Sequence, residues 1–198
     1  LKHFGYAPID VQTAMGSSEA SRKKLGEIIL TAIGQSGIKT KNVAIGLPSA
    51  KTFTTIIDVP SQSESELQKT IKYQIDQYIP MSIEDAKVDW AFLGKSINNP
   101  DKQEVLLASV AIDYSEDRLE FIEGLGLDVI AAEPDQIAMT RSLDIPDGQS
   151  ANFIVDLGEM TTDIAIVYDG APRLVRSIPI GLSTFVKAAV QNLSIKDD

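Results

Sequence analysis

The chain has 198 residues, of which 43% are hydrophobic, and its mean hydropathy is close to zero. A chain of this size buries a sizeable core, and no apolar run approaches the roughly 18 residues that a membrane span needs. A formal charge of −10 and a pI near 4.6 repel phosphate backbones and anionic lipid, so we expect neither nucleic-acid binding nor direct membrane insertion. Cysteine is absent, which excludes disulfides and thiol catalysis, and the lack of an apolar leader favours the cytoplasm.

The N-terminal part of the chain predicts pieces of a larger α/β sheet. Lys2–Ala7 is predicted to be the end of a strand. Ser18–Gln35 has apolar residues at helical spacing and precedes Gly37, which is typical of a helix end, so it predicts an amphipathic helix. Asn42–Leu47 predicts a short strand, which Pro48 ends.

Lys51 to about Ala132 predicts a second unit that begins with a strand over Thr52–Val59. Ser63 is the expected N-cap of the following helix, and Glu66 is the expected acid of its capping box. The helix is predicted to run to about Tyr78, where Ile79-Pro80 ends it. Its buried face is predicted to hold Leu67, Ile71, Ile75 and Tyr78.

The rest of this unit predicts two strands, a helix and a last strand. These are Ala86–Leu93, Glu104–Ile112, the region near Ser115–Gly124 and the region near Asp128–Ala132. The resulting β-α-β-β-α-β order is typical of a small α+β layer. Trp90 lies in an alternating strand and is expected to anchor the face of the sheet.

A phosphate-loop pattern lies between two strand patterns, Asn152–Asp156 and Asp163–Tyr168. Gly158 allows close approach of an anion, and Thr161 and Thr162 offer hydroxyl and N–H donors. Asp156 ends the first strand, where its carboxylate can hold a hydrated Mg²⁺ through bridging waters. The pattern predicts a triphosphate site, with a plain hairpin turn as the alternative.

The string DLGEMTTDIAIVYDG resembles the second phosphate motif of the actin, Hsp70 and FtsA superfamily of ATPases, and Glu133–Met139 is similar to that superfamily's first connecting motif. The resemblance implies that Glu133 positions an attacking water. A carboxylate stabilised at a helix N-terminus is the alternative. Glu159 and Met160 stand where relatives usually carry glycine, so Glu159 is expected to point to water and Met160 to pack on the core.

Four blocks in order resemble the PilM family, the actin-like cytoplasmic proteins of type IV pilus assembly: Ala44–Ser49, Lys72–Pro80, Glu84–Trp90 and Glu104–Ser109. The resemblance implies a partial α/β actin-like ATPase fold. Residues 1–50 would be part of subdomain IA, 51–130 the inserted α+β subdomain IC, 131–149 the return to IA with a connecting helix, and 150–198 the start of IIA. It further implies a first phosphate hairpin before Leu1 and further subdomains after Asp198.

The same resemblance implies the ligands and partners. ATP and Mg²⁺ are expected to bind the complete protein, whereas this chain alone is expected to bind neither well. The N-terminal peptide of the inner-membrane protein PilN is the expected partner, in a groove to which Tyr78, Ile79 and Pro80 contribute. The pilus motor ATPase is a further expected partner, and the protein would lie at the inner face of the membrane through PilN. An FtsA-like cell-division protein and an active Hsp70-like ATPase are the alternatives.

Overall fold

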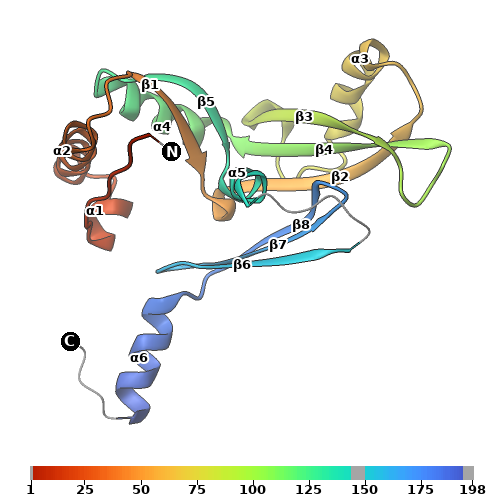
Figure 1. Cartoon of the computed structure of the whole chain (residues 1–198). Helices are drawn as coiled ribbons and strands as arrows, with labels where there is room; N and C mark the ends of the chain where they lie inside the picture. Colours follow the sequence, from red (N-terminus) through yellow and green to blue (C-terminus); the bar gives the residue numbers. More distant parts are fainter. Residues whose placement is uncertain (1, 144–149, 194–198) are drawn as a thin grey trace. The chain divides into compact units, whose positions relative to one another are not determined.

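The computed structural model describes residues 2–143 and 150–193 (Figure 1). Contacts divide these residues into two compact units, the first from Leu1–Ile45 and Tyr114–Ala132 and the second from Gly46–Asp113 and Glu133–Asp198. The predicted boundaries of subdomains IA, IC and IIA follow the family resemblance and stay predictions. No helix among the described residues combines the length and apolar character needed to cross a bilayer.

The first unit is built around α1 (Val11–Met15), α2 (Glu19–Ser36) and α4 (Ile112–Gly124), together with the paired strands β1 (Asn42–Leu47) and β5 (Asp128–Pro134). The predicted first helix is confirmed as α2. Ser18 accepts a hydrogen bond from the N–H of Ser21 at 3.1 Å, and Gly37 ends the helix with a φ of 73°. An ion pair between Arg22 and Asp117 joins α2 to α4.

The predicted strand at Lys2–Ala7 is wrong. The described residues 2–10 form no helix or strand, and Nδ1 of His3 lies 3.1 Å from the carbonyl oxygen of Ser36 at the end of α2. A strand exists only through pairing with a neighbour, and the described sheets pair none with this segment. The apolar character of the segment therefore does not produce a strand here.

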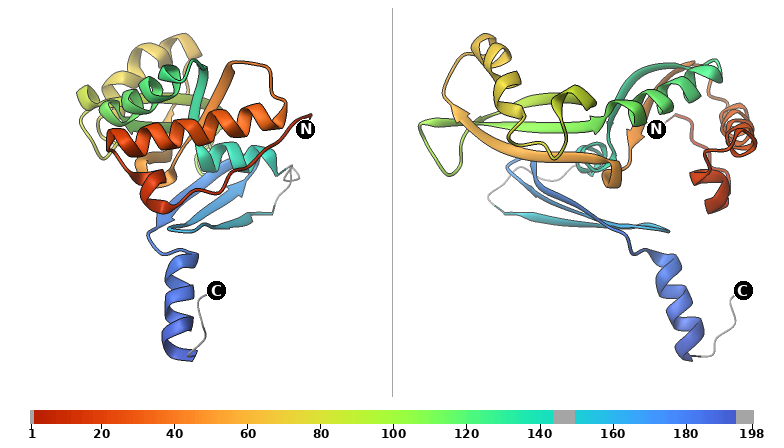
Figure 2. Two further views of the ribbon diagram at one scale, coloured as in Figure 1. Left: turned by 90° about the vertical axis from the view of Figure 1, so that its left-hand side faces the viewer. Right: turned by 180° about the vertical axis from the view of Figure 1, so that it is seen from behind.

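The second unit contains an antiparallel sheet of β2 (Thr52–Pro60), β4 (Lys102–Ala111) and β3 (Ala86–Lys95), in the order β2-β4-β3. Helix α3 (Glu64–Ile75) covers one face of this sheet (Figure 1 and Figure 2). Leu67 and Ile71 of α3 are fully buried against Val105 and Leu107 of β4. Burying each of these side chains stabilises the fold by about 1.5–3 kcal/mol. Trp90 packs against this core from β3, as its alternating pattern predicts.

The β-α-β-β-α-β order is confirmed by β2, α3, β3, β4, α4 and β5. The last strand does not join the sheet of the first three, because β5 pairs with β1 instead. Two short 3-10 helices, η1 (Ser49–Lys51) and η2 (Ile83–Asp85), lead into β2 and β3. The order of elements was thus readable locally, whereas the partner of β5 was not.

The predicted capping box at the start of α3 is confirmed. The backbone N–H of Ser63 donates to Oε2 of Glu66 at 2.9 Å, and the N–H of Glu66 donates to Oγ of Ser63 at 3.4 Å. These reciprocal bonds satisfy two backbone donors near the helix start. The hydrogen bond from the Ser63 hydroxyl, followed by that from its N–H, lowers the pKa of Glu66 from its ordinary 4.5.

We expect the first turn of α3 to loosen in acid. A lowered carboxyl pKa contributes stability that is present above the unfolded value and is lost as the pH falls through the folded value, which here begins below about pH 4.5. NMR chemical shifts of Ser65 and Glu66 should therefore lose helical character below that pH. The Glu66→Gln variant keeps the shape of the side chain without its titration, so an equal response of this variant would contradict the prediction.

The predicted end of α3 is wrong by three residues. Regular helix stops at Ile75, and the N–H groups of Tyr78 and Ile79 both donate to its carbonyl oxygen in a closing turn. Helical spacing no longer applies beyond that point, so Ile79 enters the core and Tyr78 is 42% exposed. Tyr78 therefore does not share the buried face of Leu67, Ile71 and Ile75.

The C-terminal part of the second unit contains α5 (Asp135–Ser142) and an antiparallel sheet of β6 (Asn152–Leu157), β7 (Thr162–Tyr168) and β8 (Ala171–Ile178). Asp169 and Gly170 connect β7 to β8 with φ of 52° and 68°, the left-handed backbone that a tight hairpin needs. Helix α6 (Leu182–Leu193) follows and extends away from this sheet (Figure 1). The sequence patterns predicted β6 and β7, whereas β8 and α6 were not predicted.

Candidate functional site

The predicted phosphate loop is the turn between β6 and β7. Asp156 pairs with Asp163 and Leu157 with Thr162, so residues 158–161 connect the two strands. The N–H of Gly158 donates to the carbonyl oxygen of Thr161 at 2.9 Å. A Cβ at Gly158 would lie 3.1 Å from that same oxygen, so glycine lets the two sides of the turn approach closely.

The two threonine hydroxyls point to protein partners. Oγ1 of Thr161 donates to Oδ2 of Asp163 at 3.1 Å, and Oγ1 of Thr162 donates to the carbonyl oxygen of Ile180 at 2.6 Å. The backbone N–H groups of Glu159 and Met160 have no acceptor among the described residues. Backbone amides of the turn, rather than threonine hydroxyl protons, are therefore the donors left for an anion.

Glu159 and Met160 both reach the surface of the turn. Glu159 is exposed, as expected. The expectation that Met160 packs on the core is wrong, because its side chain is 44% exposed and its sulfur lies 3.6 Å from Oγ of Ser183. Met160 is held by the start of α6 instead, because the turn faces that helix and not the core.

Asp156 is the penultimate residue of β6 and has an exposed side chain, and Gln136 of α5 reaches its carboxylate. Nε2 of Gln136 lies 3.5 Å from Oδ2 of Asp156, although Gln136 is only 1% exposed. Oε1 of Gln136 and Oδ1 of Asp163 are buried without a hydrogen-bond partner among the described residues. Unsatisfied oxygen acceptors beside a carboxylate fit a hydrated hard cation, because Mg²⁺ keeps several waters and uses few protein carboxylates.

The described residues contain no group of three or more Asp, Glu, His or Cys side chains that could hold a metal. An Mg²⁺ ion at Asp156 would therefore be held largely through water and through the nucleotide phosphates. Gln136 was missed by the sequence analysis, although it lies in the motif that drew attention to Glu133. In the sequence, Gln136 is only a polar residue in the first turn of a predicted helix. That pattern does not reveal its contact with Asp156, twenty positions further along the chain.

Glu133 lies at the end of β5 and pairs with Arg141 of α5. Oε1 of Glu133 is 2.6 Å from Nη2 of Arg141, and this hydrogen bond raises the pKa of Arg141 above its ordinary value. Arg141 is exposed, so the pair faces solvent. Of the residues in the connecting motif, Gln136 and not Glu133 makes a described contact with Asp156.

The first turn of α6 is bonded to the candidate loop. The N–H groups of Leu182 and Ser183 donate to the carbonyl oxygens of Gly158 at 2.9 Å and Glu159 at 3.1 Å. A Cβ at Gly181 would lie 2.5 Å from the Glu159 oxygen and 2.6 Å from the Gly158 oxygen. Backbone lies on both sides of this contact, so only glycine lets the helix start against the turn.

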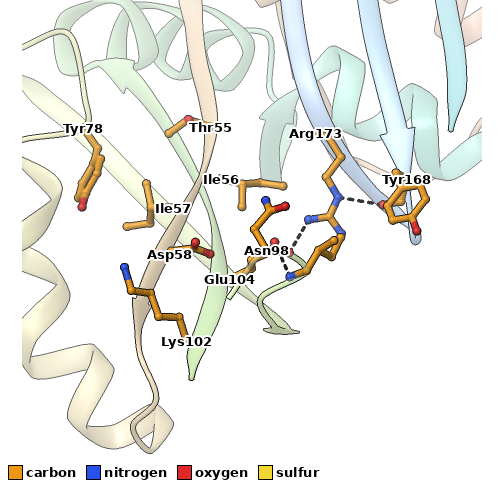
Figure 3. Close-up of a pocket in the computed structure, with 11 residues that line it drawn as sticks. Thr55, Ile56, Ile57, Asp58, Tyr78, Asn98, Lys102, Glu104, Tyr168 and Arg173 are labelled. Atoms are coloured by element: carbon orange, nitrogen blue, oxygen red, sulfur yellow. Dashed lines mark hydrogen bonds and ion pairs between the residues drawn. The ribbon is translucent and has the colours of Figure 1, made fainter. Parts of the chain in front are cut away.

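Tyr78 lines a cavity of about 630 Å³ elsewhere in the second unit. Four consecutive residues of β2, Thr55–Asp58, line the same cavity, and β2 has a paired neighbour on one side only among the described strands. Figure 3 shows Tyr78 on one side of β2 and Arg173 with Tyr168 on the other. The cavity therefore lies along an open strand edge, where backbone groups are available to a ligand. Ile79 is buried and Pro80 is exposed, and neither lines it.

A buried ion pair closes one side of this cavity. Arg173 of β8 pairs with Glu104 of β4, and their side chains are 18% and 6% exposed. Nε of Arg173 also donates to the carbonyl oxygen of Tyr168 at 3.0 Å (Figure 3), and Oε1 of Glu104 accepts from the N–H of Ile97 at 3.1 Å. The pair joins the β2-β4-β3 sheet to the β6-β7-β8 sheet.

The described elements form part of an actin-like ATPase fold, an α/β architecture in which Gln136 of α5 reaches Asp156 beside the β6–β7 turn. The family model of the type IV pilus assembly protein PilM matches residues 1–195. The chain therefore belongs to the PilM family, which confirms the resemblance seen in the sequence.

Solved structures agree with this fold. A PilM-PilN type IV pilus biogenesis complex matches with a TM-score of 0.80 at 17% identity, over 98% of this chain and 59% of that chain. The cytoplasmic domain of EpsL, an inner-membrane component of the type II secretion system of Vibrio cholerae, matches with a TM-score of 0.53 at 16% identity, over 89% of this chain and 63% of that chain. The chain thus spans less than two thirds of either protein.

Proposed function

We propose that this chain is the partner-binding part of a pilus-assembly adaptor and holds the N-terminal cytoplasmic peptide of PilN. The supporting observation is the cavity of about 630 Å³ along the open edge of β2, with Tyr78 at its wall. An extended peptide gains affinity from backbone bonds to a strand edge and specificity from side-chain pockets. The neighbouring PilM-PilN complex supports PilN as the source of that peptide.

The β6–β7 turn is proposed to bind ATP·Mg²⁺ in the complete protein. Asp156 and Gln136 would hold the water shell of Mg²⁺, and the free N–H groups of Glu159 and Met160 would face the phosphates. The exposed carboxylate of Glu159 opposes phosphate charge, and no lysine follows the turn within β7. This donor set favours nucleotide binding over fast hydrolysis, because phosphoryl transfer needs strong stabilisation of developing charge.

Membrane location follows from the partner. A chain with a net charge of −10 is repelled by anionic lipid. Binding to a peptide that is already anchored in the membrane would therefore recruit the chain to the membrane surface. The adaptor is thereby placed at the inner face of the membrane, where the pilus motor ATPase is its proposed second partner. Membership of the PilM family favours this role over that of an FtsA-like cell-division protein.

A labelled PilN N-terminal peptide should bind the complete protein, and Tyr78→Ala should weaken binding about tenfold. Tyr78 contributes an aromatic wall to the cavity, and aromatic side chains dominate binding energy at such surfaces. Fluorescence anisotropy measures the dissociation constant directly.

The matched control is Tyr73→Ala. Tyr73 is a tyrosine of α3 that is 84% exposed and does not line the cavity. Equal peptide affinity of the Tyr78→Ala and Tyr73→Ala variants would show that the cavity at Tyr78 does not bind the peptide. A complete protein that binds no PilN peptide would remove the adaptor function itself and favour the cell-division alternative.

A further inference from the structure

Helix α3 covers only part of the sheet beneath it. Val105 and Leu107 of β4 are fully buried under the helix, as is Val59 of β2. On β3 the same face is less protected, because Trp90 is half-buried and Phe92 is 47% exposed. The helix therefore leaves an apolar strip of β3 uncovered, at the edge of the sheet opposite β2.

This strip forms the floor of a groove with a volume of about 790 Å³. We name it the β3 groove, and define it by Ile71 and Ile75 of α3 and by Val88–Phe92 of β3. Five consecutive strand residues line it, so it includes the edge of β3 as well as one face. Because β3 pairs only with β4 among the described strands, alternate backbone groups along that edge point away from the sheet.

The two walls of the groove have matching repeats. Ile71 and Ile75 are four residues apart on a helix, which places them about 6 Å apart along its axis. Alternate residues of a strand are about 6.8 Å apart, and Val88, Trp90 and Phe92 follow that repeat. Because Ile71 and Ile75 are already buried, every second side chain of an added strand would meet the accessible surface of Trp90 and Phe92.

The ends of the groove limit the length of such a strand. Register shifts between Phe92 and Gly94, where Gly94 has a φ of 116°, and a bulge of this kind ends regular pairing. At the other end, η2 turns the chain away just before Ala86. The straight edge is therefore residues 86–92, which accommodates about five to seven residues of a partner.

The charges beside the groove select its occupant. Asp89 is exposed on β3, Glu84 and Asp85 are exposed in η2 just before the strand, and Lys87 is the one basic residue in the sequence between them. The net charge of −10 opposes self-association of the chain through this edge.

We propose that the β3 groove is a second docking site, distinct from the cavity at Tyr78, for a short extended segment of another polypeptide. The segment adds as a strand to the free edge of β3. Its alternate side chains are apolar and fill the groove, and the side chains between them are basic and face Asp89 and its acidic neighbours. The peptide proposed to bind along β2 is not needed for this interaction.

A display library of random heptapeptides, selected on the complete protein, tests the proposal. We expect enrichment of sequences that alternate apolar and basic residues. The best peptide, labelled and measured by anisotropy, should lose affinity when single backbone amides are N-methylated at every second position only, because an added strand uses alternate N–H groups. Selected sequences without alternation, or a methylation pattern without a period of two, would overturn the proposal.

Substitutions in the protein test whether the peptide binds in the β3 groove. Phe92→Ser should weaken binding about tenfold through the lost apolar contact, and Asp89→Lys should weaken it about fivefold. The control for charge is Asp101→Lys, which makes the same net change on an exposed residue of the β3–β4 loop and should leave affinity within about twofold. Circular dichroism checks that each variant is folded. If Phe92→Ser does not fold, the affinity of Asp89→Lys alone tests whether the peptide binds in the groove.

Three outcomes would overturn the proposal. A dimer seen by analytical ultracentrifugation, and lost in Phe92→Ser, would give the groove to a second copy. Equal peptide binding by Asp89→Lys, Asp101→Lys and the unchanged protein would place the peptide outside the groove. Competition by unlabelled PilN peptide would merge the two sites, whereas simultaneous binding supports a separate one.

Discussion

In the complete protein, the Asp156→Ala variant is expected to bind ATP·Mg²⁺ at least about tenfold more weakly than the unchanged protein, a loss of about 1.4 kcal/mol. Asp156 is exposed at the end of β6, so its carboxylate is available to the water shell of a metal and does not fill the core. The nearest described partner is the amide of Gln136, at 3.5 Å. Titration calorimetry with and without Mg²⁺ measures the effect.

Glu159→Ala is the matched control, because it removes a carboxylate from the same turn. Its exposed charge opposes the phosphates, so affinity should stay equal or rise. Gln136→Ala should behave like Asp156→Ala and weaken the Mg²⁺-dependent part of binding. If Asp156→Ala and Glu159→Ala bind alike, the turn is an ordinary hairpin and the nucleotide site lies elsewhere.

Arg173→Met is expected to destabilise the second unit by about 3 kcal/mol. It leaves the carboxylate of Glu104 buried at 6% exposure with one remaining described donor, the N–H of Ile97. Uncompensated burial of a charge costs more than the ion pair itself contributes. Thermal unfolding followed by circular dichroism should show a midpoint lower by roughly 6–12 °C, taking about 2–4 °C for each kcal/mol in a chain of this size.

The double variant Arg173→Met/Glu104→Gln separates the two contributions. It removes the buried charge along with its partner, so it should be more stable than Arg173→Met alone. Arg176→Met is the control for losing an arginine from β8, since the Arg176 side chain is exposed and, within the described part of the chain, bonds only the carbonyl oxygen of Val175. Equal midpoints for Arg173→Met and Arg176→Met would mean that the pair contributes nothing to stability.

The parts of the fold that were predictable are those specified within one element. Leu67, Ile71 and Ile75 repeat at helical spacing and all three are buried, and Ser63 with Glu66 forms the expected capping box. Prediction failed where the element ended. Ile75-Tyr78 continues the pattern in the sequence, but the helix stops at Ile75, so the position after Tyr78 enters the core instead.

The same distinction between local and long-range features applies to the candidate site. The turn from Asp156 to Thr162 is one continuous segment with its own glycine, so its position between two strands could be predicted. Gln136 and the partners of the threonine hydroxyls depend on α5 and on the segment before α6, and no local pattern reports such contacts. The edge cavity at Tyr78 likewise depends on which strand of the sheet lies outermost.

Strand β8 was overlooked despite a usable signal. Asp169-Gly170 is a typical two-residue hairpin turn, and Ala171–Ile178 after it contains leucine, valine and isoleucine. Helix α6 has an apolar face that could also be read from the sequence. Both lie beyond the motif that carried the functional interpretation.

The hydrogen bonds between the β6–β7 turn and the first turn of α6 couple the orientation of that helix to the conformation of the turn. Leu182 and Ser183 fix its first turn to Gly158 and Glu159, and no side chain at Gly181 cushions the contact. The helix has 12 residues and is therefore about 18 Å long. A tilt of about 10° at the turn would displace its far end by about 3 Å, so a small rearrangement around a phosphate is magnified at a distance. Any protein resting on the tip of α6 would thereby sense the occupancy of the loop without touching a nucleotide.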